Sequence, residues 1–107
     1  MSASAQVAGP GLVALAGELD FAGAPALRKE LERALANAGS QVTLDLGGVL
    51  RSNSVGLSLI LLAARQIDQR GGSLRVSRLP QGLKSIASVC ELDEWLASIT
   101  VEAPAEA

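Results

Sequence analysis

Residues 42–70 read VTLDLGGVLRSNSVGLSLILLAARQIDQR and hold the pattern that decides the fold. Val42, Leu44 and Leu46 alternate with Thr43 and Asp45, a period of two that predicts a β-strand. The glycine pair that follows indicates a loop over residues 47–53. A buried strand that leads through a loop into a helix is the basic unit of an α/β fold.

The second half of this stretch predicts the longest helix of the chain, Val55 to Arg70, with Gly71-Gly72 as its stop. Ser54 is expected to be the N-cap, because its hydroxyl can accept from N–H groups of the first turn. The first three turns are apolar on nearly every side, so this helix must be covered on more than one face. The apolar residues are Leu57, Leu59, Ile60, Leu61, Leu62, Ala63 and Ala64.

Upstream, the short apolar run LVALA at residues 12–16 predicts a buried strand, and Gly9-Pro10-Gly11 predicts a turn that pairs it with residues 4–8. Pro25 suits the first turn of a helix, and Gly39 is placed to end it. The apolar stripe of this helix consists of Leu27, Leu31, Ala34 and Leu35. Strand, helix and strand follow one another here in a length typical of a βαβ unit.

Downstream, Leu74 and Val76 predict another strand, and a third helix follows Pro80. Its apolar stripe would be Leu83, Ile86, Ala87 and Cys90, which makes Cys90 a buried structural thiol. A further apolar segment holds Leu92, Trp95 and Leu96, with Trp95 filling the core or its edge. Residues 98–101 are expected to form a last edge strand.

Length and composition predict one domain, 1–107, with a core at about 12–101 and a tail, 102–107, that frays. Nine basic and eleven acidic residues give a net charge of −2, which argues against nucleic acid and anionic membranes as partners. Aromatic residues are 2% of the chain, so stacking platforms for bases are excluded. The sequence contains neither a signal-peptide pattern nor an apolar run of about 18 residues, which predicts a cytoplasmic protein.

The residues offer no catalytic constellation, so we expect no enzyme, metal or cofactor. The chain has one cysteine and no histidine, which excludes most zinc sites and histidine catalysis. Glu18 and Asp20 are predicted to lie in a solvated loop, with Asp20 capping a turn. A solvated face accounts for the mild basic cluster of Arg65, Arg70, Arg75 and Arg78.

Ser54 stands out among the polar residues because it lies at a strand–loop–helix junction. A phosphate there would gain from the N–H groups and the dipole of the helix, and it would change the local charge by about −2. The unmodified hydroxyl could instead present a small polar contact to a partner. From physical chemistry alone, a simple helix cap of about 1 kcal/mol is the favoured interpretation.

The order and spacing of several motifs resemble a STAS domain, the domain of sulfate transporters and anti-sigma factor antagonists. The motifs are GELD at 17–20, APALR at 24–28, LDLGGV at 44–49, SNSVGL at 52–57 and GGSLRV at 71–76. The resemblance spans about residues 12–96. It implies a mixed sheet of four or five strands with helices packed mainly on one face, in agreement with the expectations above.

The resemblance also implies a non-catalytic, partner-binding role. In anti-sigma factor antagonists the residue that matches Ser54 is phosphorylated by the partner kinase, which ends binding. In the MlaB-like branch the matching residue lies where the domain grips the ATPase of an ABC transporter. That transporter moves phospholipids and maintains the lipid asymmetry of the outer membrane.

Two positions depart from the antagonist pattern, which has Asp before the modified residue and a small residue after it. Asn53 and Val55 stand there instead, which argues against a phosphorylation switch. The leading prediction is therefore an MlaB-like subunit that binds and regulates the ATPase of a phospholipid-transport ABC complex, peripheral to the inner membrane through that partner. The alternative is an anti-sigma factor antagonist switched by phosphorylation of Ser54, and a third class is a small-molecule-binding domain.

The predicted partner-binding surface covers the segment that opens the long helix and the exposed edge of that helix, with residues 18–21 beside it. Ser54 would be the central contact, and Gly56 would permit close backbone approach. The segment consists of Arg51, Ser52, Asn53, Ser54, Val55, Gly56 and Leu57. The identity and stoichiometry of the partner and the oligomeric state of the free domain are left open by the sequence.

Overall fold

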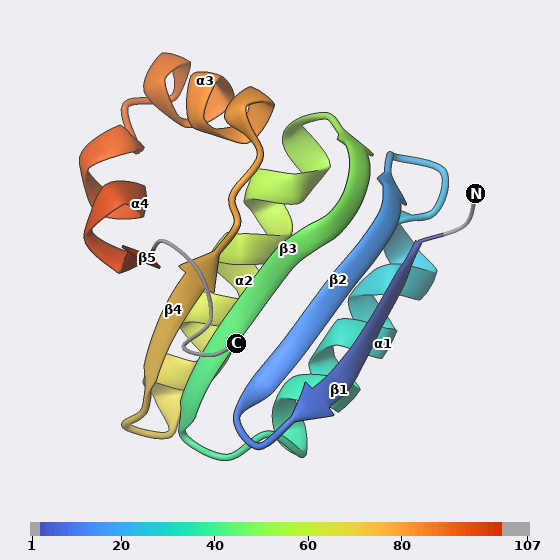
Figure 1. Cartoon of the computed structure of the whole chain (residues 1–107), viewed down its shortest axis with the longest axis vertical. Helices are drawn as coiled ribbons and strands as arrows, with labels where there is room; N and C mark the ends of the chain where they lie inside the picture. Colours follow the sequence, from blue (N-terminus) through green and yellow to red (C-terminus); the bar gives the residue numbers. More distant parts are fainter. Residues whose placement is uncertain (1–2, 102–107) are drawn as a thin grey trace.

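A five-stranded mixed sheet and four helices make up residues 3–101, the part of the chain that the computed structural model describes (Figure 1). The strand order is β1-β2-β3-β4-β5; β1 is antiparallel to β2, and all other neighbours are parallel. The predicted tail, 102–107, lies outside the described residues. In chain order the elements are β1 Ser4–Gly9, β2 Leu12–Leu19, α1 Ala24–Ala36, β3 Gln41–Ser52, α2 Ser54–Gln69, β4 Ser73–Ser77, α3 Gln81–Val89, α4 Asp93–Ile99 and β5 Thr100–Val101.

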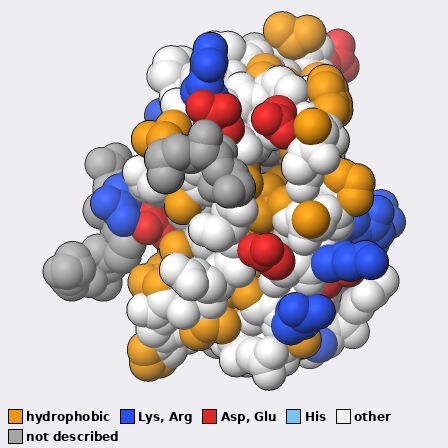
Figure 2. Space-filling view, turned by 90° about the vertical axis from the view of Figure 1, so that its right-hand side faces the viewer, with side chains coloured by type: hydrophobic (Ala, Val, Ile, Leu, Met, Phe, Trp, Pro, Cys, Tyr) orange, Lys and Arg blue, Asp and Glu red, His pale blue; other side chains and the backbone are white. Residues whose placement is uncertain are grey.

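Helices α1 and α2 cover one face of the sheet, while α3 and α4 lie at its β4–β5 end (Figure 1). Alternate residues of β2 explain this layering: Val13, Leu15 and Leu19 are at most 1% exposed, whereas Ala14, Ala16 and Glu18 are half-buried. The predicted α/β fold, with helices mainly on one face, is therefore confirmed. On the side that carries β1 and α1, apolar side chains lie in small groups between charged ones (Figure 2).

Helix α2 is the longest helix and is covered from several directions, as its all-round apolar character predicts. Seven of its residues are buried. Its Gln66 amide donates to the Glu32 carbonyl of α1 at 3.1 Å, and the Leu83 side chain of α3 packs against its first turn at Gly56. Only its outer side reaches solvent, where Leu61 is 38% exposed.

Strand β3 is longer than predicted, and the expectation of a loop over residues 47–53 is wrong. The strand continues to Ser52, which pairs with Leu19 of β2. Two register shifts let β3 keep pairing with β2 across its glycines. Gly47-Gly48 therefore marks a bulged strand and not the end of one.

The buried thiol predicted at Cys90 is also wrong, because α3 ends at Val89 and Cys90 is exposed. Glu91 adopts a left-handed φ of 60°, and the Leu92 N–H donates to the Ala87 carbonyl at 2.8 Å. This pattern is a Schellman motif, which turns the chain away before Cys90 can reach the core. The last strand is shorter than predicted, since residues 98 and 99 close α4 and only Thr100–Val101 forms β5.

All four residues of the predicted basic cluster are exposed, as expected, but two of them also make specific contacts with other elements. The Arg70 guanidinium donates to the carbonyls of Leu35 and Gly39, at 3.0 and 2.8 Å, so it joins α2 to the end of α1. Arg78 bridges back to Asp45 of β3 through two contacts, Nε to Oδ1 at 2.9 Å and Nη2 to Oδ2 at 2.5 Å. Arg65 and Arg75 are exposed as expected.

Asp45 is a buried carboxylate, 6% exposed, on the third strand of the sheet. The hydrogen bond from Arg78 lowers its pKa below the usual range, the Ser77 hydroxyl and the Gly47 N–H act in the same direction, and burial opposes them. Arg78 has a left-handed φ of 53°, which directs its side chain back across Gly47. A Cβ at position 47 would overlap the guanidinium carbon of Arg78, so a larger residue there would force the end of that side chain to shift.

Candidate partner-docking site

The candidate site lies where the carboxyl ends of β2 and β3 meet the start of α2. Parallel strands end at the same edge of a sheet, so the pairs Glu18–Arg51 and Leu19–Ser52 bring residues far apart in sequence together. The Asn53 N–H donates to the Leu19 carbonyl at 3.2 Å. The predicted neighbourhood of residues 18–21 and 51–54 is therefore present in the structure.

Asn53, and not Ser54, is the N-cap of α2. Its side-chain oxygen accepts from the Val55 N–H at 2.9 Å, and its carbonyl accepts from the Gly56 N–H at 3.0 Å. The Ser52 hydroxyl donates to the same carbonyl at 2.8 Å. The prediction that Ser54 caps the helix is wrong, because the residue before it has the extended backbone and the acceptor that a cap requires.

Ser54 is instead the first residue of α2, and it is exposed. Its carbonyl accepts from the Ser58 hydroxyl one turn later at 3.4 Å, while no side-chain hydrogen bond is found for its own hydroxyl among the described residues. The serine hydroxyl is therefore not committed to the helix end. It is available to a partner or to a modifying enzyme.

Burial divides the seven predicted contact residues into two groups. Arg51 and Ser54 are exposed, and Ser52 and Asn53 are half-buried, so these four can face a partner. Val55, Gly56 and Leu57 are buried in the fold. The expectation that Gly56 lets a partner approach is corrected: a Cβ there would overlap the Ser52 hydroxyl and lie 2.9 Å from a methyl of Leu83, so the close approach is internal.

Two apolar side chains at this end of the sheet are exposed. In the sequence-based prediction, Phe21 had no role beyond lying beside the predicted surface, and Leu50 was not considered. Phe21, in the turn after β2, is 70% exposed, and Leu50, near the end of β3, is 63% exposed. Leu50 sits at the second register shift of the β2–β3 pair, which explains why the strand alternation does not bury it. Its exposure could have been predicted, because an apolar residue next to Arg51 in a predicted loop is expected to face solvent.

A shallow hollow of about 260 Å³ lies at the paired ends of the two strands and is lined by Glu18, Leu19, Asp20, Arg51, Ser52 and Asn53. Asp20 caps the turn before α1 as predicted, since its Oδ1 accepts from the Gly23 N–H at 2.9 Å. Glu18 does not lie in the predicted loop; it belongs to β2 and is half-buried. The hollow thus combines two carboxylates and one guanidinium with the polar start of α2.

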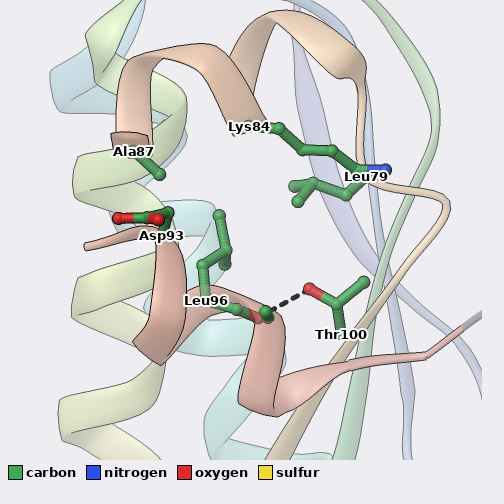
Figure 3. Close-up of a pocket in the computed structure, with 7 residues that line it drawn as sticks. Leu79, Lys84, Ala87, Asp93, Leu96 and Thr100 are labelled. Atoms are coloured by element: carbon green, nitrogen blue, oxygen red, sulfur yellow. Dashed lines mark hydrogen bonds between the residues drawn. The ribbon is translucent and has the colours of Figure 1, made fainter. Parts of the chain in front are cut away.

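A larger cavity of about 430 Å³ lies between α3 and α4, away from this site (Figure 3). Leu79, Ala87 and Leu96 form much of its wall, and the Thr100 hydroxyl is occupied by a 2.7 Å bond to the Leu96 carbonyl. The charged groups of Lys84 and Asp93 point in opposite directions in Figure 3 and do not converge on one ligand position. The cavity gives the small-molecule hypothesis a location but no polar site.

Among residues 3–101, no group of three or more His, Cys, Asp or Glu side chains is placed to hold a metal ion. Within the same range, no helix is long and apolar enough to span a membrane. The features of the candidate site that can serve in binding are the exposed serine, the mixed charges and the two exposed apolar side chains.

Residues 2–100 match the family model described as "Mlab, STAS domain". The chain belongs to the STAS-domain family. Over 82 residues it is also 30% identical to the anti-sigma-B factor antagonist of Bacillus subtilis (strain 168), an alignment that covers 77% of this chain and 74% of that protein. This STAS domain is thus similar in sequence to a known anti-sigma factor antagonist.

Solved structures agree on the fold of the STAS domain. An anti-sigma factor antagonist from Mycobacterium paratuberculosis aligns with a TM-score of 0.72 at 23% identity, covering 96% of this chain and 86% of that chain. A putative anti-sigma factor antagonist from Thermotoga maritima aligns with a TM-score of 0.74 at 19% identity, covering 97% and 89%. The unphosphorylated anti-sigma factor antagonist SpoIIAA gives 0.70 at 17% identity, covering 98% and 90%.

Proposed function

We propose that this STAS domain is a non-catalytic regulator that works as an anti-sigma factor antagonist, binding its partner through the β2–β3 end of the sheet and the start of α2. The observation that carries the proposal is the exposed Ser54 at the first position of α2, at the end of the sheet where exposed Arg51 lies near the end of β3. The 30% identity to the Bacillus subtilis antagonist supports this role over the transport role that Asn53 and Val55 had favoured.

The site is suited to a charge-based switch. A kinase partner would transfer the terminal phosphoryl group of ATP to the Ser54 oxygen, release ADP and add about two negative charges. Helix α2 would stabilise that charge at its N-terminus, whereas Glu18 and Asp20 across the hollow would repel it. The added charge would also lose water when a partner covers the start of α2, so the modified form would bind less tightly.

The test is binding of the purified STAS domain to the anti-sigma factor of its own host, measured by titration calorimetry for the wild type, Ser54→Asp and Ser85→Asp. Ser85 is the control because it is an exposed helical serine on another helix, α3, and the same substitution there adds the same charge. We expect Ser54→Asp to weaken binding at least tenfold and Ser85→Asp to leave it unchanged. Equal affinities for all three proteins would remove Ser54 from the interface.

A second candidate is regulation of the ATPase of a phospholipid-transport ABC complex, which the family description "Mlab" and the residues Asn53 and Val55 favour. Affinity purification of the tagged protein from its host separates the two candidates. The first candidate is supported if an anti-sigma factor with serine-kinase activity co-purifies and phosphorylates Ser54 when ATP is added. Co-purification of an ABC ATPase with its permease, with Ser54 unmodified, supports the second.

A further inference from the structure

The outer edge of β4 is only partly used by the sheet. Strand β5 pairs with Val76 and Ser77 alone, so the first three residues of β4, Ser73–Arg75, have β3 on one side and no strand of residues 3–101 on the other. Strand β5 runs parallel to β4 and reaches only Val76 and Ser77, so within residues 3–101 it leaves Ser73–Arg75 uncovered. An edge of this kind presents backbone groups that can pair with another chain.

A groove of about 510 Å³ lies along this free edge. One wall is the second half of α2 and the other is α4. The residues that line it are Ala64, Arg65, Asp68, Gly72, Ser73, Leu74, Arg75, Trp95 and Ile99. Trp95 and Ile99 are only partly buried, so their apolar surface remains accessible in the groove.

The backbone of Leu74 faces this groove. The Ser73 N–H donates to the Ser40 carbonyl at 2.8 Å, on the β3 side, and strand residues alternate in the side to which their N–H and C=O groups point. Leu74 therefore points its N–H and C=O outward. The Leu74 carbonyl accepts from the Arg75 guanidinium at 3.2 Å, a contact that a pairing strand can replace.

We propose that this groove binds an extended peptide segment of a partner protein, which adds to the sheet beside Ser73–Arg75 and in line with β5. Side chains of a strand alternate between faces. Those on the helix side would meet Trp95 and Ile99, and those on the other side would meet Arg75. With Arg65 and Arg75 against the single carboxylate of Asp68, the lining carries a net positive charge, so the fitting segment alternates apolar and acidic residues.

This surface is separate from the site proposed around Ser54. Arg65 and Asp68 lie eleven and fourteen residues further along α2, about 16–21 Å at the helical rise. The proposal therefore does not depend on the anti-sigma factor role. If the peptide-binding proposal is wrong, the proposal for the Ser54 site is unaffected, and the reverse also holds.

Trp95 is the only tryptophan of the chain, so its fluorescence reports directly on this groove. The probes are two acetylated and amidated hexapeptides, VEVEVE and VKVKVK. We expect a saturable change of Trp95 emission with VEVEVE and at least tenfold weaker binding of VKVKVK. Arg75→Glu should weaken VEVEVE binding at least tenfold, whereas Arg33→Glu, the same charge reversal on the exposed side of α1, should leave it unchanged.

Hydrogen exchange separates strand pairing from simple charge attraction. In the complex with VEVEVE, exchange of the Leu74 amide should slow at least tenfold. Equal binding of both peptides, no saturable response to either, no effect of Arg75→Glu, or unchanged Leu74 exchange would each overturn the proposal. A concentration-dependent dimer in light scattering that Arg75→Glu dissociates would also overturn it, since the occupant would then be a second copy of this chain.

Discussion

At the scale of single residues, the start of α2 divides two tasks between neighbouring polar side chains. Asn53 closes the helix through the Val55 N–H, and this leaves the Ser54 hydroxyl outside the capping arrangement. If one side chain both capped the helix and contacted a partner, a change in its contact or its modification would also disturb the helix end. The division therefore lets Ser54 be contacted or modified while the fold stays intact.

Alanine substitutions distinguish the two residues. We expect Asn53→Ala to lower the free energy of unfolding by about 1 kcal/mol, because a cap acceptor is lost. Ser54→Ala should change it by less than about 0.5 kcal/mol, as is usual for exposed positions. Urea unfolding followed by circular dichroism measures both changes. A larger loss of unfolding free energy for Ser54→Ala than for Asn53→Ala would mean that Ser54 caps the helix.

The sequence predicted where this site lies but not which of its side chains are exposed. Strand and helix periods placed residues 51–57 at the junction, and parallel pairing placed residues 18–21 beside them. The burial of Gly56 was not predicted, because it packs against Leu83 of α3, an element whose position depends on tertiary packing. Leu50 was missed because a register shift interrupts the alternation on which the prediction relied.

At the scale of elements, the same limitation explains the error at Cys90. The apolar spacing Leu83, Ala87, Cys90 fits a helix that continues, and Leu83 and Ala87 are indeed buried. The helix end is set by a left-handed turn at Glu91, a residue type that gives no sequence signal for it. Periodicity thus identified the helix and its buried face but not its last turn.

Glycines in α2 and α3 show how closely these two helices pack. Gly56 faces Leu83, and a side chain there must displace Leu83 or Ser52, whereas Gly82 has open space around its Cβ position. We expect Gly56→Ala to destabilise the protein by about 1–3 kcal/mol through overpacking. Gly82→Ala should stabilise it by about 0.5–1 kcal/mol, because alanine costs less backbone entropy in a helix.

Chemical denaturation of the two glycine variants gives both values in one experiment. The pair is matched because each change adds one methyl group to a glycine in the first turn of a helix. Stabilisation by Gly56→Ala would mean that α2 and α3 are less tightly packed than the structure shows.

At the scale of the whole molecule, the sheet is held together by more than its backbone ladder. Asp45 of β3 receives hydrogen bonds from Ser77 and Arg78 at the end of β4, at 3.0 and 2.9 Å for Oδ1. This cluster fixes the point at which the chain leaves β4 for α3 and α4.

The sign of the resulting pH dependence follows from the lowered pKa of Asp45, whose largest cause is the hydrogen bond from Arg78. An unfolded aspartate has a pKa of about 3.9. The stabilisation is therefore complete above that value and is lost as the pH falls through the lower pKa of the folded state. Asp45→Asn abolishes the titration, so the difference in Tm between wild type and Asp45→Asn should stay constant between about pH 7 and 5 and shrink below about pH 4. If Arg78 is the cause, adding Arg78→Ala to both proteins should remove most of this pH dependence; a difference that narrows equally without Arg78 would assign the effect to another contact.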